Sequence, residues 1–411
     1  MLKKDKKAFD LYKKEAKRQK ETIDLIASEN VMSSSVLEAL SSNLANKYSE
    51  GYPGKRYYPG NEVVDEVEKL AQARALRMFD LDEKKWGVNV QPYSGSPANL
   101  AIYLALINPG EKIMGLELAS GGHLTHGHKV SATGILFKAV QYGVDKDGRL
   151  DYKEIEALAK KEKPKIIVSG TTAYAREIDF KKFSEIAKKV GAYQVADISH
   201  IAGLVAAGLH KSPFPYADVV MSTTHKTLRG PRGAIIFGKL ELMDKINKAV
   251  FPGIQGGPHG NVMLAKAVAF QEAAQKSFVS YQKQVVKNAK QLSLSLIDLG
   301  FNLVTGGTDN HLMLVDVTNF NIDGALAENR LSRVGILANR NAVPGDDKPF
   351  KPSGIRMGTP TVTSLGMKEK EMKEIAEIIA LALANRERVD ILKKRVLNLI
   401  KKFTLLNNFK F

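Results

Sequence analysis

Between residues 88 and 238, short runs of β-branched and aliphatic residues alternate with segments of helical periodicity. This alternation is typical of an α/β domain with a mostly parallel sheet. One helix is indicated by the spacing of Phe183, Ile186, Ala187 and Val190, and Gly191 is suited to end it. The runs that we expect to form strands are VNVQPY, KIMGLE, KIIVSG, QVADIS, ADVVMS and GAIIFG.

The chain has 411 residues, which is more than one ordinary domain, and its pattern changes after residue 300. A long helical segment at about 261–298 is followed by FNLVTGG, HLMLVDV, GILANR and GIRMGTP, and then by further helices. This order predicts a smaller C-terminal α+β domain, which the long helix connects to the first. The expected division is an N-terminal helical arm at 1–38, a large domain at 39–272 and a small domain at 273–411.

The composition is that of a soluble protein, with 44% hydrophobic and 26% charged residues. We expect no membrane span, because no stretch approaches the roughly 18–20 apolar residues that one requires. The lack of cysteine excludes disulfides and thiolate chemistry. Because the N-terminus is also unlike a secretory signal, we expect a cytoplasmic protein. The net charge of +17 is dispersed and no nucleic-acid recognition module is visible, so nucleic-acid binding is not expected as the main function.

Polar residues follow three of the expected strands, where ligands bind in open α/β sheets. Ser94-Gly95-Ser96-Pro97 precedes a helical pattern, so Ser96 is a candidate N-cap and the free N–H groups a candidate phosphate site. Asp197 follows QVA, and Lys226 follows VVMSTTH. Each feature has an ordinary alternative interpretation. The Ser-Gly-Ser turn could be only a helix cap, Asp197 a turn residue and Lys226 a solvated lysine.

Taken together, these three features match the needs of a pyridoxal 5'-phosphate (PLP) enzyme. Such an enzyme requires a lysine for the Schiff base, a carboxylate for the pyridine nitrogen and an anion site for the phosphate. The histidines of GGHLTHGH could instead bind a metal, but no cysteine or acidic residue lies nearby in the sequence. We therefore expect no metal, and a histidine stacked on a flat cofactor is the better interpretation.

Several longer motifs make the chain resemble the serine hydroxymethyltransferase family, whose members are fold-type-I PLP enzymes. The resemblance extends from about residue 22 to beyond 365, and TTHKTLRGPRG with EGYPGKRYY is its most specific part. The other matching motifs are LIASEN, GGHLTHG, HIAGLVAAG, FPGIQGGP, GGTDNHL and GIRMGTP. The resemblance implies a large domain with a mostly parallel seven-stranded sheet, a small C-terminal α+β domain and an N-terminal helical arm.

The resemblance also implies roles around the cofactor. Lys226 would form the Schiff base, Asp197 would pair with the pyridine nitrogen and His123 would stack on the ring. His200 and Thr172 would lie near the ring oxygen. Thr223, beside the lysine, is a further catalytic candidate. The phosphate would be bound by Gly95 and Ser96, and by Gly256 and Gly257 of a neighbouring subunit.

Substrate-binding roles are implied in the same way. Arg356 matches the arginine that binds the substrate carboxylate, and Ser28 matches a residue that assists it. Glu50 would transfer protons, and it would enter the site from the partner subunit of a homodimer together with Tyr48, Tyr57 and Tyr58. The pterin ring of tetrahydrofolate would be held by Leu118, Gly122, Leu124 and Asn341.

Four residues depart from the family pattern. Pro97 stands where the family has a polar residue, and Ser199 stands where it has an alanine. Ser120 and Asn261 each stand where a histidine is common. They leave the lysine, the aspartate and the arginine in place, so they bear on cofactor affinity and not on the type of reaction.

The expected reaction is the reversible conversion of L-serine and tetrahydrofolate to glycine and 5,10-methylenetetrahydrofolate, through a Schiff base of PLP. It would serve glycine biosynthesis and one-carbon metabolism. Two alternatives stay open. One is a folate-independent PLP enzyme such as a threonine aldolase, and the other is a non-catalytic binding protein.

Overall fold

The computed structural model describes residues 4–346 and 351–403. By its internal contacts the chain divides into two units, one of residues 32–283 and one that combines residues up to 31 with those from 284 on. The division falls within helix α11 (Lys276–Asp298). The boundaries expected at 38/39 and 272/273 stay predictions.

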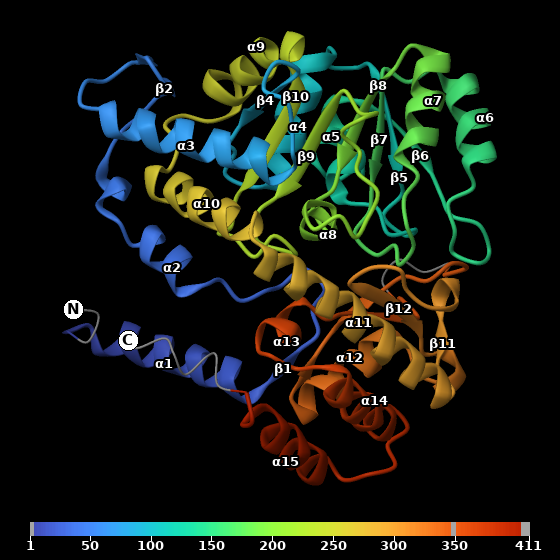
Figure 1. Ribbon diagram of the computed structural model, residues 1–411. Helices are drawn as coiled ribbons and strands as arrows, with labels where there is room; N and C mark the ends of the chain where they lie inside the picture. The colour runs from blue at the N-terminus through green and yellow to red at the C-terminus, as the bar shows by residue number, and fades with distance from the viewer. Residues whose placement is uncertain (1–3, 347–350, 404–411) are drawn as a thin grey trace. The chain divides into compact units, whose positions relative to one another are not determined.

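The unit of residues 32–283 contains a seven-stranded sheet in the order β4-β10-β9-β8-β7-β5-β6 (Figure 1). The five strands from β9 to β6 are parallel, and β10 is antiparallel to both of its neighbours. The α/β class with a mostly parallel seven-stranded sheet is therefore confirmed. The strands are β4 (Trp86–Asn89), β5 (Lys112–Leu116), β6 (Lys138–Tyr142), β7 (Ile166–Gly170), β8 (Tyr193–Asp197), β9 (Val219–Thr223) and β10 (Ala234–Lys239).

Strands β7 and β9 are buried along their whole length, which requires cover on both faces of the sheet. Helices α6 and α7 pack on each other beside β6, β7 and β8 (Figure 1), and α4 and α9 pack on β10. Helix α7 ends at Gly191 in the left-handed conformation, as its sequence predicts. The helices are α2 (Ser34–Leu40), α3 (Glu62–Met78), α4 (Gly95–Leu106), α5 (Ala132–Leu136), α6 (Tyr152–Glu162), α7 (Phe180–Val190), α8 (Ala202–Ala206), α9 (Leu240–Lys248) and α10 (Gly260–Ala273).

Two local expectations are wrong. The helical segment at 261–298 is broken at Ala274 and Gln275 into α10 and α11, although neither residue is a strong helix breaker. The N-cap of α4 is Ser94, whose backbone is extended, whereas Ser96 already lies in the first helical turn. A short hairpin of β2 (Gly51–Tyr52) and β3 (Lys55–Arg56) completes this unit.

The second unit contains a four-stranded antiparallel sheet in the order β11-β12-β15-β14. Strand β1 (Ile23–Asp24) pairs in parallel with β13 (Ile336–Leu337), so the N-terminal segment shares the hydrophobic core of the C-terminal residues. The remaining strands are β11 (Asn302–Leu303), β12 (Leu312–Asp316), β14 (Asn339–Asn341) and β15 (Gly354–Gly358). The helices are α1 (Lys6–Glu21), α12 (Gly324–Val334), α13 (Pro360–Ser364), α14 (Glu369–Leu383) and α15 (Val389–Ile400).

Candidate active site

Asp197 and Lys226 lie at the same edge of the sheet. Asp197 is the last residue of β8, and Lys226 follows the end of the adjacent parallel strand β9 by three residues. Both side chains are nearly buried, with 8% and 9% exposure. His123 lies near this pair: its ring centroid is 5.8 Å from that of His126, whose Nε2 is 3.2 Å from Asp197 Oδ2. The structure thus brings together three residues that are far apart in the sequence.

The Asp197 carboxylate is held by hydrogen bonds at both oxygens. Oδ1 accepts from the Ser199 backbone N–H at 3.1 Å and from the Ser199 hydroxyl at 2.6 Å. Oδ2 accepts from Asn99 Nδ2 at 3.0 Å and lies 3.2 Å from His126 Nε2. Burial acts to raise the pKa of Asp197, but the bond to His126 and nearby histidine charge outweigh it and hold that pKa well below its usual value. The carboxylate therefore stays ionised, as a partner of a protonated pyridine nitrogen must.

His123 stays neutral over the physiological pH range, because burial lowers its pKa to about 4. Its Nδ1 lies 2.7 Å from the Thr125 hydroxyl, which fixes the orientation of the ring. An uncharged, fixed imidazole is suited to lie against the face of a flat cofactor.

The loop around Lys226 is rigidly held. The Thr224 hydroxyl donates to the Pro231 carbonyl, and the Thr227 hydroxyl donates to the His200 carbonyl at 2.9 Å. Among the described residues, the Thr223 hydroxyl is buried without a hydrogen-bond partner. A buried polar atom of this kind usually serves a ligand or a water molecule, so it fits a polar cofactor beside Lys226.

The turn from Ser94 to Ser96 is suited to bind a phosphate. The N–H groups of Gly95 and Ser96 lie in the first turn of α4, where helices leave donors without internal partners. A Cβ at Gly95 would lie 2.9 Å from Thr223 Cγ2, so this turn packs closely on the end of β9. Together with Asp197, His123 and Lys226, the turn makes a set of residues that fits PLP.

Thr172, Gly122, Leu118 and Leu124 surround the turn that carries His123. The Thr172 hydroxyl donates to the Gly122 carbonyl at 2.9 Å and to the Gly121 carbonyl at 3.1 Å. A Cβ at Gly122 would lie 1.9 Å from the Leu116 carbonyl oxygen, so only glycine fits there. Leu118 and Leu124 are each 41% exposed. Their expected contact with a pterin ring stays a prediction.

The residues expected to serve a partner subunit form a second, exposed cluster. Tyr57 is 71% exposed, and Tyr48 and Tyr58 pack edge to face with ring centroids 5.2 Å apart. A Cβ at Gly256 would lie 3.3 Å from Glu50 Oε1, so Glu50 lies against the Gly256-Gly257 segment of its own chain. Glu50, the three tyrosines and this segment therefore occupy one surface.

A buried ion-pair network supports this cluster. The Arg56 guanidinium, 4% exposed, donates to the Glu68 carboxylate at 2.6 Å and to Asp65 at 2.8 Å. The same group donates to the carbonyls of Ser49 at 2.9 Å and Gly51 at 2.7 Å. Because these carbonyls flank Glu50, Arg56 fixes the main chain that carries it.

In the unit that contains both termini, the loop with Ser28 lies against the end of β15. The Gly358 N–H donates to the Leu25 carbonyl at 2.8 Å, and a Cβ at Gly358 would lie 2.7 Å from Ala27 Cα. Arg356 lies two residues earlier on β15, and its Nε donates to Asn339 Oδ1 at 3.0 Å. Burial lowers the pKa of Arg356 to about 10, so the guanidinium remains charged.

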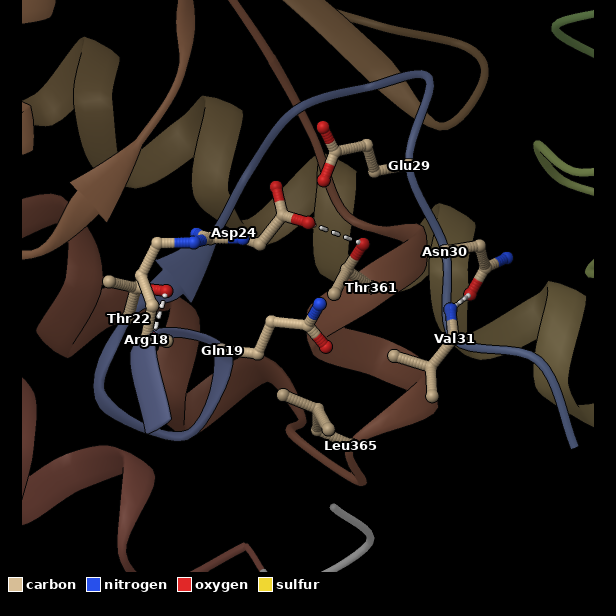
Figure 2. Close-up of a pocket in the computed structure, with 9 residues that line it drawn as sticks. All are labelled: Arg18, Gln19, Thr22, Asp24, Glu29, Asn30, Val31, Thr361 and Leu365. Atoms are coloured by element: carbon tan, nitrogen blue, oxygen red, sulfur yellow. Dashed lines mark hydrogen bonds between the residues drawn. The ribbon is translucent and has the colours of Figure 1, made fainter. Parts of the chain in front are cut away.

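In the same unit, a cavity is lined by the acidic Asp24 and Glu29 together with Arg18, with uncharged polar side chains and with two apolar ones (Figure 2). The Asp24 carboxylate accepts from the Ile26 N–H at 2.8 Å and from the Thr361 hydroxyl at 3.2 Å. Burial, and then the charge and hydrogen bond of Glu29, raise the pKa of Asp24 to about 8. Asp24 therefore keeps its proton to a higher pH than an ordinary carboxyl group does.

Comparison with known proteins agrees with this geometry. The family model of serine hydroxymethyltransferase matches residues 1–379. A serine hydroxymethyltransferase of Methanosarcina barkeri is 55% identical over 393 residues, which cover 95% of this chain and 94% of that protein. The chain belongs to the serine hydroxymethyltransferase family. It is thus a fold-type-I PLP-dependent transferase with glycine hydroxymethyltransferase activity.

The departures from the serine hydroxymethyltransferase pattern have local structural roles. Ser199 adds the 2.6 Å hydrogen bond to Asp197, which an alanine could not make. The Ser120 hydroxyl donates to Glu117 at 2.6 Å, and Asn261 Nδ2 donates to the Leu40 carbonyl at 2.8 Å. Pro97 lies in the first turn of α4, where its missing N–H breaks no helical hydrogen bond.

Two residues that hold Asp197 were not predicted from the sequence. Asn99 lies one turn after Gly95 on α4 and is an isolated polar residue in an apolar helix, which was an available signal. His126 was visible only as one of several histidines in its run.

The described residues bear on two further expectations, those about metals and membranes. Within residues 4–346 and 351–403, no group of three or more His, Cys, Asp or Glu side chains could hold a metal ion. In the same ranges, no helix is both long and apolar enough for a transmembrane segment.

Proposed function

We propose that the protein catalyses the reversible conversion of L-serine and tetrahydrofolate to glycine and 5,10-methylenetetrahydrofolate, with PLP bound at Lys226. The observation that carries this proposal is the grouping of the buried Lys226 and Asp197 with the partly buried His123 beside the phosphate-binding turn. Family membership supplies the substrates, serine, glycine and tetrahydrofolate. The activity would contribute to glycine biosynthesis.

PLP, when bound, supplies an electron-withdrawing ring that accepts the electron pair released as the Cα–Cβ bond of serine breaks. Asp197 would keep the proton on the pyridine nitrogen, and its ionised state supports that role. His123 would cover one face of the ring, and Gly95 and Ser96 would bind the phosphate. His200, Thr172 and Thr223 would complete the surroundings of the cofactor.

Arg356 would bind the substrate carboxylate through its planar guanidinium, assisted by Ser28. Glu50 would move a proton at the hydroxymethyl group of serine, with Tyr58 beside it. Leu118, Gly122, Leu124 and Asn341 would hold the pterin ring of tetrahydrofolate. The fixed position of the Glu50 main chain, supplied by Arg56, supports a role that requires accurate placement.

The active unit in this proposal is a homodimer with shared sites. Tyr48, Glu50, Tyr57, Tyr58, Gly256 and Gly257 would serve the site of the partner subunit. Their grouping on one surface, with Tyr57 and Tyr48 exposed, supports this assignment. A cytoplasmic location, without nucleic acid or membrane as a partner, is proposed from the composition.

The experiment that tests the proposal compares glycine binding with and without tetrahydrofolate. We expect the yellow protein to develop a long-wavelength absorption band with glycine, and tetrahydrofolate to strengthen that band strongly. An identical response with and without folate would instead favour a folate-independent aldolase. A colourless protein that borohydride does not modify at Lys226 would favour a non-catalytic binding protein.

A further inference from the structure

Lys266 is a buried cation for which the proposed function provides no role. It lies in the middle of α10 and is 1% exposed. Its ammonium donates to three main-chain carbonyls, those of Val90 at 2.6 Å, Pro92 at 3.1 Å and Ala234 at 2.8 Å. A lysine ammonium has three protons, so its donor capacity is used completely.

Two of the three carbonyls belong to the segment that precedes the Ser94–Ser96 turn. The third belongs to the strand that follows the loop carrying Lys226. Val90 and Pro92 follow β4 and lie just before the Ser94–Ser96 turn, and Ala234 begins β10. The Gln91 carbonyl between them accepts from Gln255 Nε2 at 2.9 Å. Every carbonyl of residues 90–92 is therefore held by a side chain from outside the strand, two of them by Lys266.

The stem of Lys266 also contacts the loop that carries Lys226. A Cβ at Gly233 would lie 2.6 Å from Lys266 Cε, and the Gly233 carbonyl accepts from the Thr224 N–H at 3.0 Å. The same side chain thus binds the segment that precedes Gly95 and packs against Gly233, at the end of the loop that carries Lys226. Burial lowers the pKa of Lys266 to about 7, because removing an ammonium from water disfavours its charged form. A methionine of similar length would fill the space without that cost.

We propose that Lys266 is a positioning residue for the cofactor phosphate. Its ammonium fixes the main chain that leads into the Gly95 and Ser96 donors, and so it determines the affinity for PLP. The inference rests on the proposed function, because it takes the Ser94–Ser96 turn as the phosphate site.

The test measures the binding of PLP and of pyridoxal, which lacks the phosphate, to the full-length apoprotein by absorption titration. Lys266→Met should weaken PLP binding about tenfold or more, the size expected when the hydrogen bonds of a buried charged group are lost. Pyridoxal binding should change much less, because pyridoxal does not use the phosphate turn. The matched control is Arg74→Met, which removes a 3.0 Å hydrogen bond from a cation on α3 to the Ala267 carbonyl of α10. The control should alter neither affinity.

A second variant keeps the test decisive if Lys266→Met does not fold. Gly233→Ala retains the ammonium of Lys266 but displaces it, since the new methyl group would meet Lys266 Cε. This variant should also weaken the binding of PLP more than the binding of pyridoxal. Equal losses of PLP and pyridoxal affinity, or no loss in either variant, would overturn the inference. A wild-type apoprotein that binds no PLP would instead overturn the proposed function.

Discussion

The buried pair of Arg56 and Glu68 gives the sharpest prediction about stability. In Arg56→Met, the Glu68 carboxylate, which has no exposed surface, loses its cation and retains only the Gln91 amide at 2.9 Å. Removing one partner of a buried ion pair typically costs about 3–5 kcal/mol of unfolding free energy. We expect a loss of this size, measured by urea denaturation followed by circular dichroism.

The pH dependence of that loss identifies its cause. Burial already raises the pKa of Glu68, and Arg56 opposes this increase, so the pKa should rise further in Arg56→Met. The folded variant then binds a proton that the unfolded chain releases, and its stability falls as pH rises. The deficit relative to wild type should grow by at most about 1.4 kcal/mol per pH unit, up to the new pKa.

The control is the double variant Arg56→Met with Glu68→Gln, which removes the buried Glu68 charge together with its ion-pair partner. With the Glu68 carboxylate gone, this variant should recover part of the lost stability and lose the additional pH dependence. A deficit that is independent of pH, or a double variant no more stable than Arg56→Met, would refute this explanation.

Three further predictions concern the site and its surroundings. Asp24→Asn should be more stable than wild type at pH 8, and this gain in stability should shrink as the pH falls toward 4. The reason is that Asp24 has a pKa of about 8 in the folded protein and ionises near pH 4 when unfolded. Denaturation across this pH range tests the prediction, and a difference in stability that is independent of pH would contradict it. Gly122→Ala should lower the melting temperature and weaken tetrahydrofolate binding, since its methyl group would meet the Leu116 carbonyl; unchanged folate affinity would exclude a role of this turn. Asp197→Asn should still bind PLP through Lys226 but convert serine far more slowly, and steady-state assays that show near-normal turnover would exclude Asp197 as the partner of the pyridine nitrogen.

The sheet was largely predictable because its inner strands are continuous apolar runs. Strand β6 gave no such signal, since Lys138 and Ala139 at its start are exposed and the strand lies at the edge of the sheet. The break between α10 and α11 was also hidden, because Ala274 and Gln275 are good helix formers and tertiary packing decides the conformation there.

The residues that do chemistry were more visible than the residues that position them. Asp197 ends a strand and Lys226 follows the next one, and that placement by itself indicates a ligand site. Lys266 lies in an ordinary helical sequence, and all three of its acceptors are main-chain carbonyls. Arg56 lies on the short strand β3, and two of its acceptors are also main-chain carbonyls, which no side-chain pattern reveals. The pairing of β1 with β13, between residues more than three hundred positions apart, has no local signal either.

The most direct measurement of the central claim is the conversion of serine to glycine by the wild-type protein and by Lys226→Ala, each with and without tetrahydrofolate. The wild-type protein with folate should produce glycine and 5,10-methylenetetrahydrofolate in equal amounts, and glycine formation should fall sharply without folate. Lys226→Ala should lose turnover in both conditions. Serine conversion that does not depend on folate, or a Lys226→Ala variant that keeps wild-type turnover, would contradict the account.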